Sequence, residues 1–261
     1  MADLFSLKGK VALVTGASKE MGQEVAHALA EYGADVAVTA RTAAQLEATA
    51  ARVRQTGRKA LVIPADLTDI PKLPSIVSRT VDALGGLDIL VNVAGGGDYS
   101  NYGWALRMTE EMWDNMFLLN LKAPMFLCQA AANVMKDHGG GSIVNLGSGC
   151  NKLAFPSLVA YTASKGGIEM FTKEAAVELG RYGIRVNCIA PGSIESERTR
   201  TEDPDYAGTW SRLTPLGRVG TAADIAPTVV FLASKGASFI SGQTIWIDGA
   251  LFTQAQWPYK K

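Results

Sequence analysis

The sequence has few of the residues that form disulfides, bind metals or attract nucleic acids. Cys128, Cys150 and Cys188 are far apart and never form a Cys-x-x-Cys pair, so we expect free thiols in a reducing compartment. Two histidines cannot supply a zinc cluster, and we expect no metal. The 25 basic residues balance 25 acidic ones. A chain without net charge or a dense basic run is a poor candidate for binding nucleic acid or anionic membranes.

Long apolar segments and linkers are also missing. No run approaches the ~18 apolar residues of a membrane helix, and residues 1–10 lack the apolar stretch of a signal peptide. The 27 glycines and 10 prolines follow no period, and 48% of the residues are hydrophobic, which excludes collagen-like and disordered chains. We find no internal repeat. We therefore expect a cytoplasmic protein with one domain over residues 1–261, large enough to bury a core without disulfides or metals.

Short apolar runs alternate with helical segments along the whole chain. Most of these runs are continuously apolar, as expected for strands that helices cover on both faces. The alternation predicts an α/β fold: a doubly wound (Rossmann) parallel sheet of about seven strands. The predicted strands are residues 10–15, 35–40, 60–65, 87–93, 142–147, 184–190 and 244–247.

Two long helical stretches, 109–136 and 158–182, stand out. The first is apolar nearly all round, with Trp113, Phe117 and Phe126 among its residues. A helix that packs on one sheet face needs only one apolar stripe. The excess apolar surface indicates either a subunit interface or a deeply buried helix, and these residues alone leave both open.

A glycine-rich turn, residues 15–22 (TGASKEMG), lies between the first predicted strand and the first predicted helix. Gly16 allows the tight turn, and Gly22 allows the helix to pack closely on the strand. Backbone N–H groups and the helix N-terminus can then meet a pyrophosphate. Because many α/β proteins have two glycines after a strand, the turn alone does not define a cofactor site.

Tyr161 and Lys165 are four residues apart at the start of a predicted helix, which places them on one helix face. Ser148 ends a predicted strand thirteen residues before Tyr161. A nearby ammonium favours phenolate, so the pKa of Tyr161 would fall from its usual ~10 toward neutrality, which suits a general acid or base. A surface tyrosine beside a solvated lysine is the competing interpretation.

Together these motifs resemble the short-chain dehydrogenase/reductase family over residues 7–251. The resemblance implies an NADP- or NAD-dependent enzyme that interconverts a ketone and a secondary alcohol by hydride transfer, most often as a homotetramer. The matching residues are the glycine-rich turn, Asp66, the run Asn92-Val93-Ala94-Gly95, Asn120, Ser148, Tyr161, Lys165, Pro191-Gly192, and residues 241–243 and 248–249.

The resemblance also implies the roles of four catalytic residues. Tyr161 would exchange a proton with the substrate oxygen, Lys165 would hold the nicotinamide ribose and lower the Tyr161 pKa, and Ser148 would hydrogen-bond the substrate oxygen. Asn120 would kink its helix and hold a water that connects Lys165 to solvent. The implied cofactor-binding residues are Gly16, Ser18, Lys19, Met21, Gly22, Arg41, Asp66, Leu67, Asn92, Ala94, Gly95, Tyr161, Lys165, Pro191, Gly192, Ile194 and Ser196.

Two residues depart from the family's pattern. Val93 stands where a second Asn is usual, which removes a side-chain tie between strands. Glu20 stands where a Gly is usual, close to the expected pyrophosphate. A carboxylate ~4 Å from another anion costs from ~1 kcal/mol in water to ~4 kcal/mol near a protein surface. We therefore expect Glu20 to point away from the cofactor or to pair with a neighbour such as Lys19.

The end of the second predicted strand indicates which nicotinamide is used. An NAD site needs an acidic residue about twenty residues beyond the glycines, and this chain has Ala40 and Arg41 there. Arg41 can bind a 2′-phosphate in bidentate fashion, and Lys19 can add a second charge. A solvated Arg41 is the alternative, but it would leave no residue to bind NAD. We therefore expect NADP(H).

The substrate pocket is expected beside the loops that follow the fourth and fifth strands. Aromatic residues there suit a cyclic or aromatic ketone, although such residues also serve packing. The polar stretch 198–210, within a segment of about 195–214, is predicted to be a mobile lid; a permanently ordered surface loop is the alternative. The expected pocket residues are Gly97, Tyr99, Cys150, Asn151, Tyr206 and Trp210.

Three other functions compete with a small-molecule reductase. A serine hydrolase of the nucleophile-elbow type has its catalytic His after the Ser, and no His follows His138. A non-catalytic NADP sensor would usually have lost a catalytic residue, and none is lost. The resemblance also permits a 3-oxoacyl-[acyl-carrier-protein] reductase. That enzyme would want a basic docking face, whereas residues 195–205 hold five acidic residues against Arg198 and Arg200.

Overall fold

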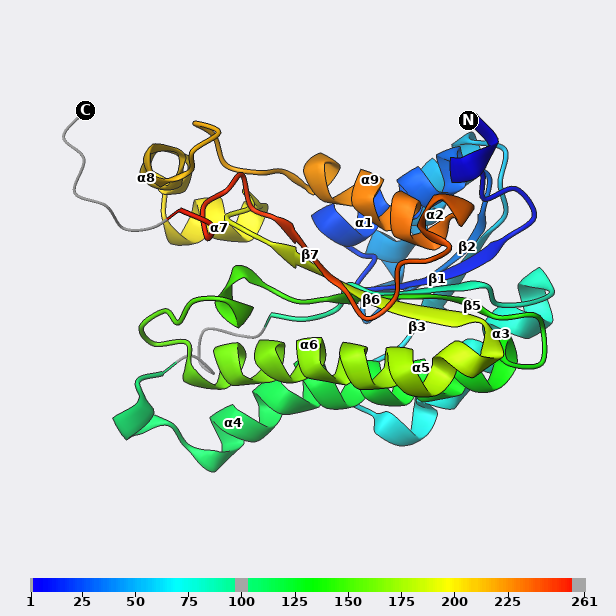
Figure 1. Ribbon diagram of the computed structural model, residues 1–261, viewed down its shortest axis with the longest axis horizontal. Helices are drawn as coiled ribbons and strands as arrows, with labels where there is room; N and C mark the ends of the chain where they lie inside the picture. Colours follow the sequence, from blue (N-terminus) through cyan, green and yellow to red (C-terminus); the bar gives the residue numbers. More distant parts are fainter. Residues whose placement is uncertain (1, 97–102, 255–261) are drawn as a thin grey trace.

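The computed structural model describes residues 2–96 and 103–254, and within them a parallel sheet forms the centre of the molecule (Figure 1). Across the sheet the strands are ordered β3-β2-β1-β4-β5-β6-β7. Successive strands are added on one side of β1 up to β3 and on its other side from β4 onward, as in doubly wound folds. The structure therefore confirms the predicted fold class. The strands are β1 (Val11–Thr15), β2 (Asp35–Ala40), β3 (Ala60–Pro64), β4 (Ile89–Asn92), β5 (Gly141–Leu146), β6 (Ile184–Pro191) and β7 (Thr244–Ile247).

Helices cover both faces of the sheet (Figure 1). One face carries α1 (Glu20–Glu31), α2 (Ala43–Gln55) and α9 (Ala222–Ala233). The other carries α3 (Leu73–Leu84), α4 (Glu110–Phe117), α5 (Ala123–Met135) and α6 (Val159–Leu179). The shorter helical segments are η1 (Ala2–Phe5), η2 (Ile70–Lys72), η4 (Ala105–Arg107), η6 (Gly149–Asn151), η7 (Gly180–Tyr182) and η8 (Lys235–Ala237).

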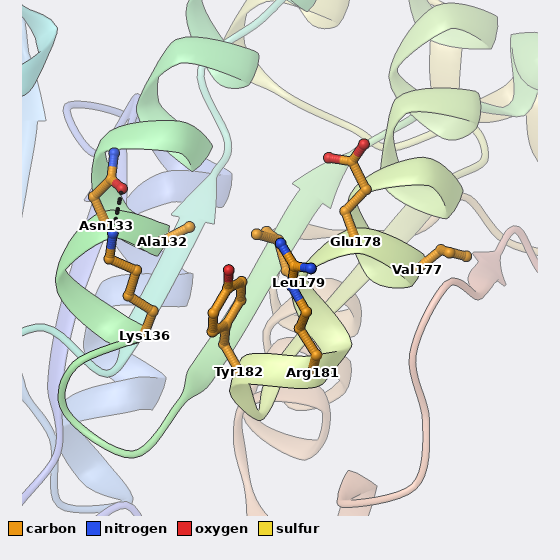
Figure 2. Close-up of a pocket in the computed structure, with 8 residues that line it drawn as sticks. All are labelled: Ala132, Asn133, Lys136, Val177, Glu178, Leu179, Arg181 and Tyr182. Carbon is orange, nitrogen blue, oxygen red and sulfur yellow. Dashed lines mark hydrogen bonds between the residues drawn. The ribbon is translucent and has the colours of Figure 1, made fainter.

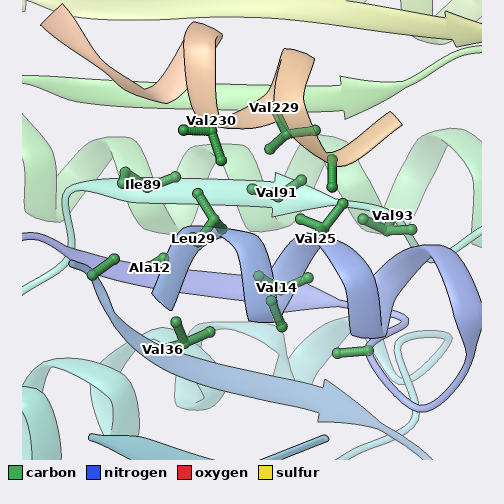
Figure 3. Packing of buried hydrophobic residues seen from close by; sticks show 14 of the residues in the cluster. Ala12, Val14, Val25, Leu29, Val36, Ile89, Val91, Val93, Val229 and Val230 are labelled. Atoms are coloured by element: carbon green, nitrogen blue, oxygen red, sulfur yellow. The ribbon is translucent and has the colours of Figure 1, made fainter. Parts of the chain in front are cut away.

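The core lies in two layers, one on each side of the sheet. Successive residues of a strand point to opposite faces, so Ala12 and Val14 of β1 pack in one layer and Leu13 in the other. Figure 3 shows the first layer, in which Val25 and Leu29 of α1 pack with strand residues such as Val14 and Val91. Because both faces are buried, β1 is apolar along nearly its whole length, which explains why the sequence pattern identified it.

The stretch 109–136, expected as one helix, is interrupted. It forms α4, a π-helical turn η5 (Leu118–Lys122), and then α5. Two features account for the interruption: the Asn120 side chain bonds the backbone of Gly96, and Pro124 in the first turn of α5 has no backbone N–H to donate. The resemblance implied a distortion at Asn120, and the π-helical turn lies at that residue.

The segment 195–214, expected as a mobile lid, contains two short helices. They are α7 (Glu197–Glu202) and α8 (Tyr206–Leu213). Ser196 caps α7, because its hydroxyl accepts from the N–H of Thr199 at 3.1 Å. Local capping therefore orders a sequence too polar to bury much surface, and the mobility of this segment stays a prediction. Among the described residues, no helix is both long and apolar enough to cross a membrane.

Candidate active site

A cavity of about 860 Å³ lies at the edge of the sheet where β1 to β4 end. This is where ligands bind in open parallel sheets, at the point where the strand order reverses. Its walls include eight residues predicted to bind the cofactor: Gly16, Ser18, Lys19, Arg41, Asp66, Leu67, Ala94 and Gly95. Residues that follow different strands thus come together in one site.

The glycine-rich turn leaves no room for side chains at its two glycines. Gly16 has φ +64°, and a Cβ there would lie 2.8 Å from the backbone of Ala94. A Cβ on Gly22 would lie 2.2 Å from the carbonyl oxygen of Gly16. The hydroxyl of Thr15 accepts from the N–H of Ala94 at 3.1 Å. The two glycines therefore let the turn pack closely against Ala94 and the start of α1, and Gly16 lies in the cavity wall.

Arg41 and Asp66 lie at the end of the cavity formed by β2 and β3. The side chain of Arg41 is exposed directly after β2. The carboxylate of Asp66 accepts from the backbone N–H of Thr68 at 2.9 Å and from its hydroxyl at 2.8 Å. These bonds lower the pKa of Asp66, and the charge of Arg41 lowers it further. Asp66 is therefore an oriented acceptor beside a cation.

Lys165 is the most unusual residue of the site because its ammonium is buried. Only 1% of the residue is exposed, and its Nζ donates to the carbonyl oxygen of Leu146 at 2.7 Å. Burial lowers its pKa to about 8. The Nζ lies 5.8 Å from the ring centroid of Tyr161, which is half-buried one turn earlier on α6. The predicted pairing of these two side chains on one helix face is therefore present.

Asn120 lies beside Lys165 and holds the loop that follows β4. Its Oδ1 accepts from the N–H of Gly96, and its Nδ2 donates to the carbonyl of the same residue, both at 2.8 Å. A Cβ on Gly95 would lie 2.8 Å from the Asn120 Oδ1 and 3.0 Å from the Lys165 Nζ. The backbone of Gly95 therefore lies between the amide and the ammonium.

Ser148 follows β5 and begins η6. Its hydroxyl accepts from the N–H of Cys150 at 3.2 Å. Cys150, expected in the substrate pocket, is buried, and burial raises the pKa of its thiol. Asn151, also expected there, donates from Nδ2 to the Glu169 carboxylate at 3.0 Å and so ties η6 to α6. All three cysteines are buried free thiols.

The segment 195–214 contributes two residues to an aromatic cluster. The ring centroid of Trp210 in α8 lies 6.1 Å from that of Tyr206 and 6.4 Å from that of Phe155. The ring centroids of Phe155 and Phe252 lie 5.6 Å apart. Burial raises the pKa of Tyr206. Sequence reasoning named Tyr206 and Trp210 but missed Phe155 and Phe252, which no local motif marks. Two further expected pocket residues, Gly97 and Tyr99, lie outside the described residues.

The remaining predicted cofactor residues, Tyr161 and Lys165 among them, do not line this cavity. Met21 packs against the core layer of α1, and Asn92 donates to Asn145 at 2.9 Å, tying β4 to β5 next to Val93. The N–H of Gly192 donates to Ile247 at 2.9 Å, which places Pro191 and Gly192 at the end of β6. Ile194 lines a smaller hollow of about 90 Å³, and Ser196 caps α7.

Of the two expectations for Glu20, pointing away from the cofactor or pairing with a neighbour, the structure shows a pairing, but with a residue of α7 and not with Lys19, the neighbour named as one possibility. The Lys19 Nζ instead contacts the Glu197 carboxylate at 3.0 Å. The Glu20 carboxylate accepts a hydrogen bond from the backbone N–H of Glu197. The first backbone N–H groups of a helix have no acceptor within the helix, and the Glu20 carboxylate supplies one to Glu197. Arg198, predicted only as part of the lid, lines the cofactor cavity.

A second hollow, of about 500 Å³, lies between the C-terminal ends of α5 and α6 (Figure 2). Asn133 of α5 and Lys136, just beyond its end, form one wall, and Val177 of α6 and Tyr182 of η7 form the other. None of the predicted catalytic or cofactor residues lines it.

Comparison with known proteins gives consistent results. A family model described as enoyl-(acyl carrier protein) reductase matches residues 16–251. The chain is 36% identical to gluconate 5-dehydrogenase of Gluconobacter oxydans (strain 621H), over 95% of this chain and 97% of that protein. It is 37% identical to 3-oxoacyl-[acyl-carrier-protein] reductase FabG of Staphylococcus aureus (strain Mu50), over 93% and 98%.

A solved structure is similar over nearly the whole chain. Gluconate 5-dehydrogenase from Burkholderia cenocepacia J2315, in complex with NADP and tartrate, superposes with a TM-score of 0.90. It is 31% identical, and the match covers 97% of this chain and 99% of that one. The structural similarity and the sequence similarity therefore lead to the same group of related proteins.

Proposed function

The chain belongs to the short-chain dehydrogenase/reductase family of oxidoreductases, and from that premise we propose that it interconverts a ketone and a secondary alcohol with NADP(H). The observation that carries the proposal is the buried Lys165 ammonium, 5.8 Å from the Tyr161 ring and beside the backbone of Gly95. Burying a cation that is bonded to a neutral oxygen lowers the stability of the fold. A role in proton transfer explains why the ammonium is buried at this place.

In the proposed reaction NADP(H) supplies or accepts the hydride, and this chain's residues handle the proton. During reduction Tyr161 donates its phenolic proton to the substrate oxygen, and during oxidation it takes the proton back. The Lys165 ammonium favours the resulting phenolate by Coulomb attraction in a poorly solvated site. Ser148, at the end of β5, donates a hydrogen bond to the same substrate oxygen and stabilises the charge that develops there.

Asn120 positions these groups. Its two bonds to Gly96 hold the loop that follows β4, whose Gly95 lies next to the Lys165 ammonium, and so fix the surroundings of that ammonium. The bare backbone at Gly16, where a Cβ would lie 2.8 Å from Ala94, fits a dinucleotide pyrophosphate.

The choice of NADP(H) rests on Arg41. It is an exposed cation at the cavity wall, directly after β2, at the position where an NAD site has an acidic residue. A guanidinium there binds a 2′-phosphate through paired hydrogen bonds. The presence of NADP in the Burkholderia cenocepacia relative supports the same choice.

For the substrate we propose a small carbonyl compound rather than a carrier-protein thioester. The lid segment 195–214 would cover it, and this segment lacks a free basic face: Arg198 contacts Glu202, Arg200 contacts Glu195, and Arg212 contacts Asp205. An acidic carrier protein would meet net negative charge there. The gluconate 5-dehydrogenase relatives, named for a small polar substrate, point the same way.

We also propose a homotetramer in which copies meet through α5 and α6. Met170 and Val177 are 63% and 79% exposed, and their spacing of seven residues places them on one face of α6. The open hollow between α5 and α6 lies on this face (Figure 2). A symmetric contact would let one apolar face cover its own copy.

The test is a panel of ketones with NADPH and NADH, followed by cofactor absorbance. The panel contains a keto-sugar acid, a 3-oxoacyl thioester and a cyclic ketone. With the best substrate, Tyr161→Phe should lower kcat by about 10²–10⁴-fold. Tyr32→Phe, at an exposed phenol beyond α1, is the matched control. Near-normal turnover of the Tyr161 variant would contradict the proposed proton donor.

A further inference from the structure

Two contacts join the glycine-rich turn to the start of the lid. The Glu20 carboxylate accepts from the backbone N–H of Glu197, the first residue of α7. The Lys19 Nζ contacts the Glu197 carboxylate at 3.0 Å. Neighbouring residues of the turn thus bind the backbone and the side chain of one lid residue, 177 and 178 positions further along the chain.

The backbone at Glu20 is strained in a way that the contact explains. Glu20 has φ +37°, in the left-handed region that non-glycine residues rarely occupy. Glycine would adopt this conformation freely, but glycine carries no acceptor for the Glu197 N–H. The hydrogen bond from Glu197 to the Glu20 side chain therefore compensates for the free-energy cost of this backbone conformation.

The residue after Glu197 reaches the cofactor cavity. Arg198 lines this cavity, and its Nη1 lies 3.4 Å from where a Cβ on Gly96 would be. Glu202, one turn later on α7, contacts the Arg198 Nε at 3.3 Å. The direction of the first turn of α7 decides whether this guanidinium faces the cavity. That turn is held at Glu197.

We propose that Glu20 is a positioning residue that fixes the first turn of α7 against the glycine-rich turn and so keeps the Arg198 guanidinium over the phosphates of the bound dinucleotide. The inference rests on the proposed function, because it takes this cavity to be the cofactor site. Arg198 then adds a third cation to Lys19 and Arg41 around a ligand that carries several negative charges.

The same contact removes an electrostatic conflict. A free carboxylate on the glycine-rich turn would repel a pyrophosphate. The Glu20 carboxylate is instead directed at the N-terminal turn of α7, where N–H groups and the helix dipole favour an anion. The Glu20 carboxylate, which would otherwise repel the cofactor, thus holds the first turn of α7, from which Arg198 attracts the cofactor.

The test compares three Glu20 variants that all lack the negative charge. Glu20→Gln keeps an oxygen acceptor at the same reach. Glu20→Gly and Glu20→Asn suit a positive φ, but the first has no acceptor and the second is one methylene too short. In the free protein we expect amide exchange of residues 197–199 to quicken about ten- to a hundredfold for Gly and Asn, the factor typical of one charge-assisted hydrogen bond. For Gln we expect less than about threefold.

NADPH affinity then shows whether Glu20 acts through Arg198. We expect Glu20→Gly and Arg198→Gln each to weaken NADPH binding about tenfold, the order of one charge-assisted contact. The double variant should lose no more NADPH affinity than Arg198→Gln alone, because a positioning residue has no effect once the residue that it positions has been replaced. Glu20→Gln should stay within about threefold of the wild type in the same titration.

Three outcomes would overturn the inference. Equal amide exchange in Gln, Gly and Asn variants would show that the acceptor does not hold α7. Additive losses in the double variant would show that Glu20 and Arg198 act independently. A change in substrate KM without a change in NADPH affinity in Arg198→Gln would place the guanidinium on the substrate. Failure of the wild type itself to bind NADPH would instead contradict the proposed function.

Discussion

Replacing Lys165 by methionine should stabilise the free protein while it abolishes most turnover. Methionine matches the length of the lysine stem but carries no charge. Lys165 is 1% exposed, and its Nζ has the Leu146 carbonyl as its acceptor at 2.7 Å. The fold therefore has to bury an ammonium, for which a neutral oxygen compensates poorly.

The size of the effect follows from the pKa. Burial lowers the pKa of Lys165 from 10.5 to about 8, which corresponds to about 3 kcal/mol of unfolding free energy at pH 7. Methionine leaves the Leu146 carbonyl without its donor, which costs about 1 kcal/mol. The variant should therefore be more stable than the wild type by about 2 kcal/mol at neutral pH.

The pH dependence gives the sharper test. Between pH 8 and 10.5 the unfolded lysine still holds a proton that the folded one has lost, so wild-type stability rises with pH in this window. The advantage of the methionine variant should shrink there, vanish near pH ~10 and become a disadvantage of up to about 1 kcal/mol at higher pH, where only the lost hydrogen bond to Leu146 remains. Below pH 8 the advantage should be constant.

Urea unfolding at one protein concentration, in steps from pH 7 to 10.5, measures the difference. Lys173→Met is the matched control on the same helix, because Lys173 is half exposed and contacts Glu169 at 3.0 Å. It should change stability by less than about 0.5 kcal/mol at every pH. A Lys165→Met variant that is less stable than the wild type at pH 7, or whose advantage does not change with pH, would refute the reasoning.

Three further predictions concern the cofactor, the lid and the assembly. Arg41→Ala should weaken NADPH binding about tenfold or more and NADH binding hardly at all; equal losses in fluorescence titrations would show that Arg41 is structural. Amides of residues 203–213 should exchange more slowly once NADPH and substrate are bound, and strong protection in the free protein would contradict a mobile lid. Val177→Glu should reduce the particle seen by light scattering toward the 27.6 kDa subunit; a wild type already of that mass would contradict the tetramer.

The sequence by itself determined the fold class and the order of its elements. The strands at 35–40 and 244–247 were predicted with the bounds that the structure has. A strand covered by helices on both faces must be apolar almost throughout, so burial leaves a local pattern that can be read directly. The pairing of Tyr161 with Lys165 is likewise local, because one helical turn separates them.

Only the tertiary structure decided how distant segments meet at the edge of the sheet. The Asn120 side chain at the break of the 109–136 stretch bonds the backbone of Gly96, which precedes it by 24 residues. The partner of Glu20 lies in α7, whereas sequence reasoning could name only the adjacent Lys19 as one possible partner. Hydrogen bonds of this kind depend on where each loop returns after its strand, and that position is set by the packing of the whole sheet rather than by any pattern in the residues that form the bond.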